Sequence, residues 1–221
     1  MEIQKKIQEI KKLISDNVSL VAVSKTKPIE DLQEAYDAGQ RIFGENKIQE
    51  MVDKFDVLPK DIQWHMIGHL QSNKVKYMAH FVDLIHGVDK FKTLKEINKQ
   101  AKKHNRVINC LLQAKIAKEE TKFGLSFEDI DQILQSPEMT ALENIKIVGF
   151  MGMASFTDNQ TQLKEEFSSL KNFFEKHKTQ TAIANCQLDV LSMGMSGDYN
   201  LAIENGSTMI RVGSSIFGKR S

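Results

Sequence analysis

Eight short apolar segments recur along this 221-residue chain, each separated from the next by a stretch of helical or polar character. They have the length and composition of buried strands, and they are residues 18–23, 41–43, 62–67, 82–88, 107–113, 145–150, 188–191 and 208–212. Strands that alternate with helical crossovers predict a parallel sheet. Eight such units favour a closed (β/α)8 barrel, and a doubly wound open sheet is the alternative.

The segments between the strands carry helix signals. Pro28 stands at the first position of a predicted helix that ends at Gly39. Ser126 and Asp129 form a capping-box pattern, and Asp158 is predicted to cap a long helix. An extra amphipathic helix precedes the first strand, and its apolar face consists of Ile3, Ile7, Ile10, Leu13 and Ile14. Because no linker or shift in composition divides the chain, we expect one domain over residues 1–221.

Charge and cysteine content exclude several classes of protein. Lys and Arg total 30 and Asp and Glu total 29, so no basic excess favours nucleic acid or an anionic membrane as a partner. The N-terminus lacks the apolar core of a signal peptide, and no run is long enough to span a bilayer. Cys110 and Cys186 lie in apolar runs, which is typical of reduced, buried thiols in a cytoplasmic protein. We expect a monomer.

In a parallel barrel, the residues that act on a ligand lie where strands end and the following loops begin. The loops after the seventh and eighth predicted strands, residues 192–196 and 213–215, are built from Ser, Gly and Met. Small residues let backbone N–H groups approach an anion, and serine hydroxyls add donors. These loops therefore predict a phosphate site, with two ordinary turns as the alternative.

Lys25 follows the first apolar run, where a strand would enter the barrel mouth. Burial disfavours the charged form of a lysine and lowers its pKa, and a neutral amine attacks an aldehyde to form a Schiff base. Lys25 is therefore a candidate nucleophile, with a solvated surface lysine as the alternative. Lys27, which precedes Pro28, is predicted to face solvent.

Arg211 lies on the eighth predicted strand, on the same face as Met209. A buried arginine requires an acceptor, which is either a ligand atom or the partner in a structural salt bridge. His65 lies on the third strand and is predicted to be a core histidine rather than a catalytic one. The spacings of the histidines and cysteines indicate no metal site.

Several motifs together resemble one known family. They are AVSKTKP (22–28), FGENKIQE (43–50), WHMIGHLQSNK (64–74), KEETKFGL (118–125), GFMGMAS (149–155) and LSMGMSGDYNLAIENGSTMIRVGSSIFG (191–218). The chain resembles the pyridoxal phosphate homeostasis protein family over essentially its whole length, and the last motif is the most specific. The resemblance implies a single (β/α)8 barrel similar to the N-terminal domain of alanine racemase.

The resemblance also implies a cofactor, pyridoxal 5′-phosphate (PLP), held as an internal aldimine on Lys25. Arg211 would face the pyridine nitrogen, and Asn46 would lie against the ring. The phosphate would be held by Ser192 and by Gly213 and Ser214, with Met193 and Gly194 nearby.

An arginine beside the pyridine nitrogen makes PLP a poor electron sink. Racemisation also needs a second acid/base group, and Tyr36, Tyr77 and Tyr199 all lie in or near predicted helices. We therefore expect a non-catalytic carrier that buffers or supplies PLP, with PLP-dependent apoenzymes as the recipients. The alternatives are a PLP-dependent amino-acid racemase, an aldolase that uses Lys25 without PLP, and a binding module without lysine chemistry.

Overall fold

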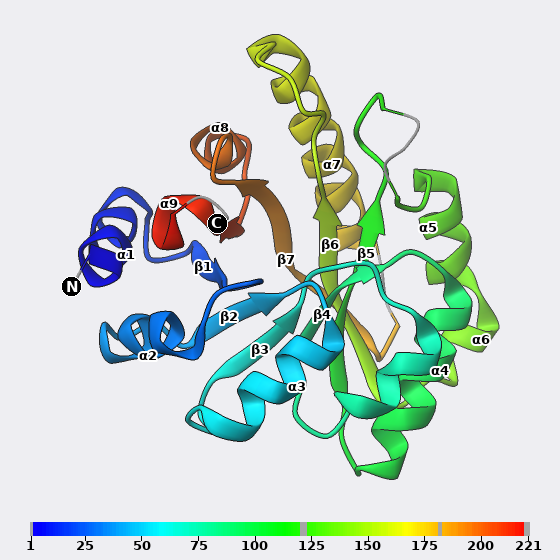
Figure 1. Cartoon of the computed structure of the whole chain (residues 1–221). Helices are drawn as coiled ribbons and strands as arrows, with labels where there is room; N and C mark the ends of the chain where they lie inside the picture. The colour runs from blue at the N-terminus through cyan, green and yellow to red at the C-terminus, as the bar shows by residue number, and fades with distance from the viewer. Residues whose placement is uncertain (1, 120–122, 181–182, 219–221) are drawn as a thin grey trace.

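A closed barrel of eight parallel strands forms the centre of the protein (Figure 1). The computed structural model describes residues 2–119, 123–180 and 183–218. The strands pair in chain order, and β8 pairs with β1 to close the barrel. They are β1 (Ser19–Val23), β2 (Ile42–Glu45), β3 (Gln63–Met66), β4 (Leu84–Val88), β5 (Ile108–Ala114), β6 (Ile145–Gly152), β7 (Cys186–Met195) and β8 (Met209–Val212). Each overlaps one predicted segment, so the predicted barrel is confirmed and the open sheet was the wrong alternative.

Helices surround the barrel (Figure 1). They are α1 (Glu2–Leu13), α2 (Ile29–Asp37), α3 (Ile48–Val57), the 3₁₀ helix η1 (Ser72–Tyr77), α4 (Phe91–Lys103), α5 (Phe127–Gln135), α6 (Pro137–Thr140), α7 (Gln160–Gln180), α8 (Tyr199–Glu204) and α9 (Ser214–Phe217). The extra N-terminal helix is α1, which buries Ile3, Ile7 and Ile10 and packs against α2 and α9. The two ends of the described chain therefore meet on one side of the barrel.

Alternate side chains of each strand face opposite sides of the sheet. Outward-facing residues such as Phe43, Trp64 and Phe150 join the core between the strands and the helices. Inward-facing residues form a second, smaller apolar cluster of Val21, Leu84, Leu111, Met151 and Met209. This inner apolar layer fills the barrel on the amino-terminal side of the positions that reach the mouth.

Two residues further along the same strands, the inward positions become largely polar. They are occupied by Val23, His86, Gln113 and Arg211, and Met153 follows directly after the end of β6. The alternation of the strands therefore places a polar layer directly above the inner apolar layer, at the end of the barrel where ligands bind in this fold.

The helix-boundary predictions have different outcomes. Pro28 was predicted at the first helical position, but it is the N-cap of α2, which begins at Ile29. The Ser126–Asp129 capping box is present at the start of α5, with both reciprocal hydrogen bonds formed. At α7 the prediction was one residue early, because Asn159 rather than Asp158 precedes the first helical residue. The Asn159 side chain accepts a hydrogen bond from the Gln162 N–H at 3.1 Å.

The capping box gives a testable stability effect. We expect Ser126→Ala to lower the free energy of unfolding by about 1 kcal/mol, because the Asp129 N–H loses its acceptor. Urea denaturation followed by circular dichroism measures this change. Ser126→Asp keeps a capping oxygen and should stay within a few tenths of a kcal/mol of the native protein; an equal loss in both variants would contradict the capping role.

Both cysteines are buried and unpaired, as predicted. Burial raises the pKa of the Cys186 thiol to about 11 and that of Cys110 still further, so both are unreactive thiols. Of the helices in the described ranges, none has the length and apolar character that a bilayer span requires.

Candidate functional site

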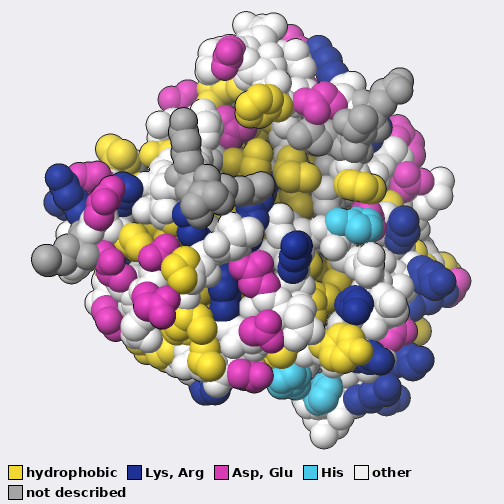
Figure 2. Space-filling model, in the orientation of Figure 1, with side chains coloured by type: hydrophobic (Ala, Val, Ile, Leu, Met, Phe, Trp, Pro, Cys, Tyr) yellow, Lys and Arg dark blue, Asp and Glu magenta, His cyan; other side chains and the backbone are white. Residues whose placement is uncertain are grey.

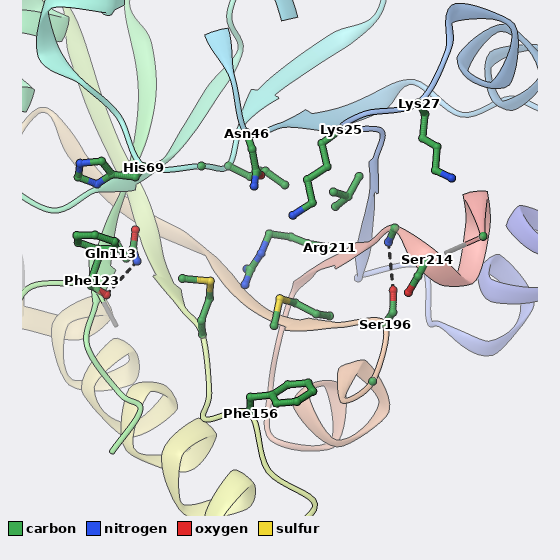
Figure 3. A pocket seen from close by; sticks show the side chains of 18 residues that line it. Lys25, Lys27, Asn46, His69, Gln113, Phe123, Phe156, Ser196, Arg211 and Ser214 are labelled. Atoms are coloured by element: carbon green, nitrogen blue, oxygen red, sulfur yellow. Dashed lines mark hydrogen bonds between the residues drawn. The ribbon is translucent and has the colours of Figure 1, made fainter. Parts of the chain in front are cut away.

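A cavity of about 590 Å³ opens at the carboxyl ends of the strands (Figure 3). On the surface, apolar side chains gather around the hollow in the upper half of the face shown in Figure 2. The residues that line it come from the ends of strands and the loops that follow them, on every strand but β4: Val23, Lys25, Lys27, Asn46, Ile67, Gly68, His69, Gln113, Phe123, Met153, Phe156, Met195, Ser196, Gly197, Arg211, Gly213, Ser214 and Gly218. Five of the eight predicted site residues are among them.

Lys25 reaches the cavity because it continues the inward-facing series of β1 after Val21 and Val23. Its side chain is half-buried and extends into the cavity toward the same region as Arg211 (Figure 3). Lys27 was predicted to face solvent, and this prediction was wrong. Lys27 also lines the cavity, and its ammonium group donates to the Phe217 carbonyl at 2.8 Å, because α9 folds over this loop.

Arg211 is a buried cation held by neutral oxygens. Its guanidinium donates to the Ser192 carbonyl at 2.9 Å, to the Ser192 hydroxyl at 2.6 Å and to the Gly152 carbonyl at 3.1 Å. Burial lowers the pKa of Arg211 to about 10, against the opposing effect of Asp198, so the group stays charged at neutral pH. The guanidinium is therefore fixed in orientation at the cavity floor.

Ser192 belongs to a buried hydrogen-bonded chain that crosses the barrel. Its Oγ lies 3.2 Å from His86 Nδ1, and His86 Nε2 lies 3.0 Å from His65 Nδ1. Because Arg211 donates to the Ser192 oxygen, the serine proton is available for His86, whose other nitrogen then donates to His65. His65 is thus a core histidine, as predicted, and the chain orients the hydroxyl that supports Arg211.

Ser192, which was predicted to hold the phosphate, and Met193 and Gly194, which were predicted to lie nearby, do not line the cavity. Ser192 lies beneath Arg211, and the Met193 side chain packs in the outer core. Gly194 adopts a positive φ of 91°, and a side chain there would meet Ala202 and Tyr199. The physical reason is that β7 runs to Met195, four residues beyond its predicted end, so the loop begins later.

Ser196 and Gly197 line the cavity in their place, beside the predicted Gly213 and Ser214. The Gly213 N–H donates to Ser196 Oγ at 3.2 Å, which joins the β7 and β8 loops (Figure 3). Hydroxyls and backbone donors of the β7 and β8 loops are therefore concentrated on one side of the cavity, and Ser196 rather than Ser192 is the serine of the β7 loop that lines it.

Asn46 lines the wall between Lys25 and His69 (Figure 3). Gly68 packs against it so closely that a Cβ atom would lie 2.5 Å from the Asn46 carbonyl oxygen. His69 stacks on Phe123 at 4.7 Å and pairs with Asp89 at 3.3 Å. His69, Gln113, Phe123 and Phe156 also line the cavity and were not predicted to do so, although His69 and Phe123 lie within the motifs at 64–74 and 118–125.

The buried histidines give a pH prediction. Burial lowers the pKa of His65 to about 3 and that of His86 well below its usual value, with the neighbouring His65 and Arg211 as further causes for His86. An unfolded chain binds protons at these sites below about pH 6.5 and the folded chain does not. Stability is therefore complete above pH 6.5 and falls as the pH drops toward 3.

We expect ¹⁵N NMR of the imidazoles to show both rings neutral from pH 8 to pH 5, with a fixed tautomer for His86. The same residues in urea-unfolded protein should titrate near pH 6.5 and serve as the control. A ring that becomes protonated in the folded protein above pH 5 would contradict the hydrogen-bond directions assigned between Ser192, His86 and His65.

The site combines an amine, a fixed cation and hydroxyl donors around one cavity with apolar walls. Such an arrangement fits a flat aldehyde that carries an anionic group, with the aldehyde at Lys25, the anion at Ser196 and Ser214, and a ring acceptor at Arg211. In the part of the chain that the structure describes, no group of three or more His, Cys, Asp or Glu side chains has the arrangement of a metal site.

The fold and the site define a (β/α)8 barrel of the alanine racemase N-terminal type. The family model of the alanine racemase N-terminal domain matches residues 1–221. Alanine racemase from Clostridium difficile shares the fold with a TM-score of 0.79 at 14% identity, covering 99% of this chain and 57% of the racemase.

Relatives that share a higher sequence identity with this chain show which family within this fold class it belongs to. PipY of Synechococcus elongatus, in a structure without PLP, has a TM-score of 0.91 at 33% identity and covers 98% of this chain and 100% of its own. A PipY structure with PLP bound has a TM-score of 0.88. The pyridoxal phosphate homeostasis protein of a Synechocystis species is 39% identical over 214 residues, 96% of each chain. The chain belongs to the pyridoxal phosphate homeostasis protein family.

Proposed function

We propose that this protein binds PLP at the barrel mouth, covalently through Lys25, and holds it for intracellular cofactor homeostasis. The observation that carries the proposal is the meeting of Lys25 and Arg211 in one cavity whose far side carries the hydroxyls of Ser196 and Ser214. When bound, PLP supplies an aldehyde that condenses with a primary amine and releases water. PipY, a relative at 33% identity, has a structure with PLP bound.

The residues of this chain have separate tasks in the proposal. Arg211 presents N–H donors to the pyridine nitrogen, and its own geometry is held by Ser192. Asn46 borders the ring, while Ser196, Gly197, Gly213 and Ser214 receive the phosphate. Ser192, Met193 and Gly194 support this arrangement from behind the cavity wall.

We further propose that the protein stores or supplies PLP rather than turning over a substrate. A donor such as Arg211 leaves the pyridine nitrogen unprotonated, which weakens the ring as an electron sink. Within the described residues, the cavity lining contains no tyrosine to act as a second acid or base. The racemase alternative would use His65 or a bound water as the second base, and His65 is buried outside the cavity lining, where its ring lies 3.0 Å from His86.

The proposed setting is the cytoplasm, with PLP-dependent apoenzymes as recipients and a monomeric carrier. The support for a reducing compartment is that Cys110 and Cys186 are both buried and unpaired.

The test is an absorbance spectrum of the purified protein, followed by borohydride reduction and peptide mapping. A pyridoxyl group on Lys25 is the expected result. If the protein bound added PLP without modification of Lys25, covalent attachment would be ruled out and the protein would be a non-covalent binding module. Accelerated exchange of the Cα hydrogen of any amino acid with deuterated solvent would instead support the alternative function, an amino-acid racemase.

A further inference from the structure

A buried charged cluster lies behind Lys25 and outside the cavity. Lys54 is 5% exposed and Glu45 is fully buried, and Glu50 lies beside them nearer the surface. The Lys54 ammonium donates to Glu45 Oε1, to Glu50 Oε1 and to the Ser24 carbonyl, each at 2.8 Å. These three acceptors use all three of its protons. Removing charges from water is costly, and none of these three side chains lines the cavity.

The cluster holds the residues on both sides of Lys25. Before it, the Ser24 hydroxyl donates to Glu45 Oε1 at 2.6 Å, and the Ser24 carbonyl accepts from Lys54. After it, the Thr26 N–H donates to Glu50 Oε1 at 2.5 Å. The short backbone segment that carries Lys25 is therefore fixed at both ends by side chains of β2 and α3.

The backbone at Thr26 shows why such support is needed. Thr26 has a φ of 63°, in the left-handed region that non-glycine residues rarely occupy. It lies in a tight turn closed by the Lys27 N–H and the Ser24 carbonyl at 3.1 Å. A residue in this region keeps its conformation only where its surroundings fix it, and Glu50 provides a contact to its N–H.

We propose that Glu50 and Lys54 are positioning residues for Lys25, because they set the turn from which its amine enters the cavity. The proposal rests on the proposed function, in which Lys25 is the reacting amine. A reacting group that shifts by about 1 Å loses much of its rate advantage, up to roughly 100-fold. The cluster acts through the backbone and makes no contact with the ligand.

The test compares Glu50→Ala with Glu50→Gln in the full chain. We expect Glu50→Ala to slow attachment of PLP to Lys25 roughly 10-fold, measured from the absorbance of the bound cofactor. Glu50→Gln keeps an acceptor for the Thr26 N–H and should retain most of the native rate. Glu175→Ala is the matched control, since Glu175 forms a surface pair with Lys171 at the same i, i+4 spacing.

A second variant separates positioning from general damage. Glycine adopts a positive φ without support, so we expect Thr26→Gly combined with Glu50→Ala to recover much of the lost rate. If the double variant is as slow as Glu50→Ala alone, or if Glu50→Ala attaches PLP at the native rate, the positioning role is overturned.

A ligand-free readout distinguishes this proposal from the proposed function. Acetic anhydride at limiting concentration labels lysines according to their accessibility and basicity, and mass spectrometry gives the rate at Lys25 relative to Lys60. We expect Glu50→Ala to change this ratio at least 2-fold and the double variant to restore it; an unchanged ratio would contradict positioning. Failure of the native protein to bind PLP, together with a changed ratio, would reject the proposed function and keep the positioning role.

Discussion

Lys25→Ala is expected to abolish covalent PLP binding, so that borohydride reduction leaves no pyridoxyl adduct on the protein. Among the described residues, Lys25 is one of two lysines in the cavity lining, and its side chain extends toward Arg211. The other, Lys27, donates to the Phe217 carbonyl under α9. Within the described part of the lining, the Lys25 amine therefore has no equivalent substitute, and we expect the absorbance band of the bound cofactor to revert to that of the free aldehyde.

A second substitution separates the charge of Lys25 from its nucleophilicity. Lys25→Arg keeps the positive charge but lacks a primary amine, because a guanidinium is not deprotonated in proteins. We expect it to bind PLP non-covalently, with the same loss of the borohydride adduct as Lys25→Ala. Retention of a mapped adduct on another cavity residue in either variant would show that Lys25 is not the attachment point.

Phe150→Ala is expected to lower the free energy of unfolding by about 3–5 kcal/mol, the usual cost of removing a buried phenylalanine. Phe150 is fully buried on the outward face of β6. Its ring packs against Phe173, Phe174 and His177 of α7, at centroid distances of 5.3, 6.1 and 6.1 Å. The substitution leaves a cavity between β6 and α7, and neither element can fill that cavity alone. A fall in Tm of roughly 10 °C follows for a domain of this size.

The chain supplies its own control for this experiment. Phe156 follows the same strand six residues later, yet its side chain is 95% exposed at the rim of the cavity. Phe156→Ala should change Tm by no more than about 2 °C, because little apolar surface leaves contact with protein. Equal losses in the two variants would contradict the assignment of Phe150 to the core between β6 and α7.

The barrel could be predicted from sequence because its strands are buried on both faces. Such strands appear as continuous apolar runs rather than alternating ones, and all eight runs became strands. Helix signals were accurate where the chemistry is local, as in the capping box of Ser126 and Asp129. They failed by one residue at Asp158, since Asp and Asn are almost equally good caps and adjacent candidates are indistinguishable without the backbone.

The residues of the candidate site were predicted less completely than the strands of the barrel, and the reason is physical. Strand alternation alone sets the direction of the Lys25 and Arg211 side chains, so their place in the cavity lining could be predicted from the sequence. Ser192 was misplaced because β7 continues to Met195 and its register against β8 shifts between these residues. His69 follows β3 and Gln113 lies near the end of β5, and whether a side chain at these positions turns into the cavity depends on local backbone geometry that spacing along the chain does not encode.

The inner apolar layer of Val21, Leu84, Leu111, Met151 and Met209 has a consequence for exchange. Its side chains fill the barrel interior beneath Arg211, so the described residues leave the cavity open only at the carboxyl ends of the strands. In the proposed function, PLP would therefore leave through the same opening by which it enters. Binding and release could not take place at the same time from opposite ends of the barrel. In the proposed function, an apoenzyme that receives PLP would have to approach the carboxyl ends of the strands, and one PLP molecule would have to leave before the next could bind.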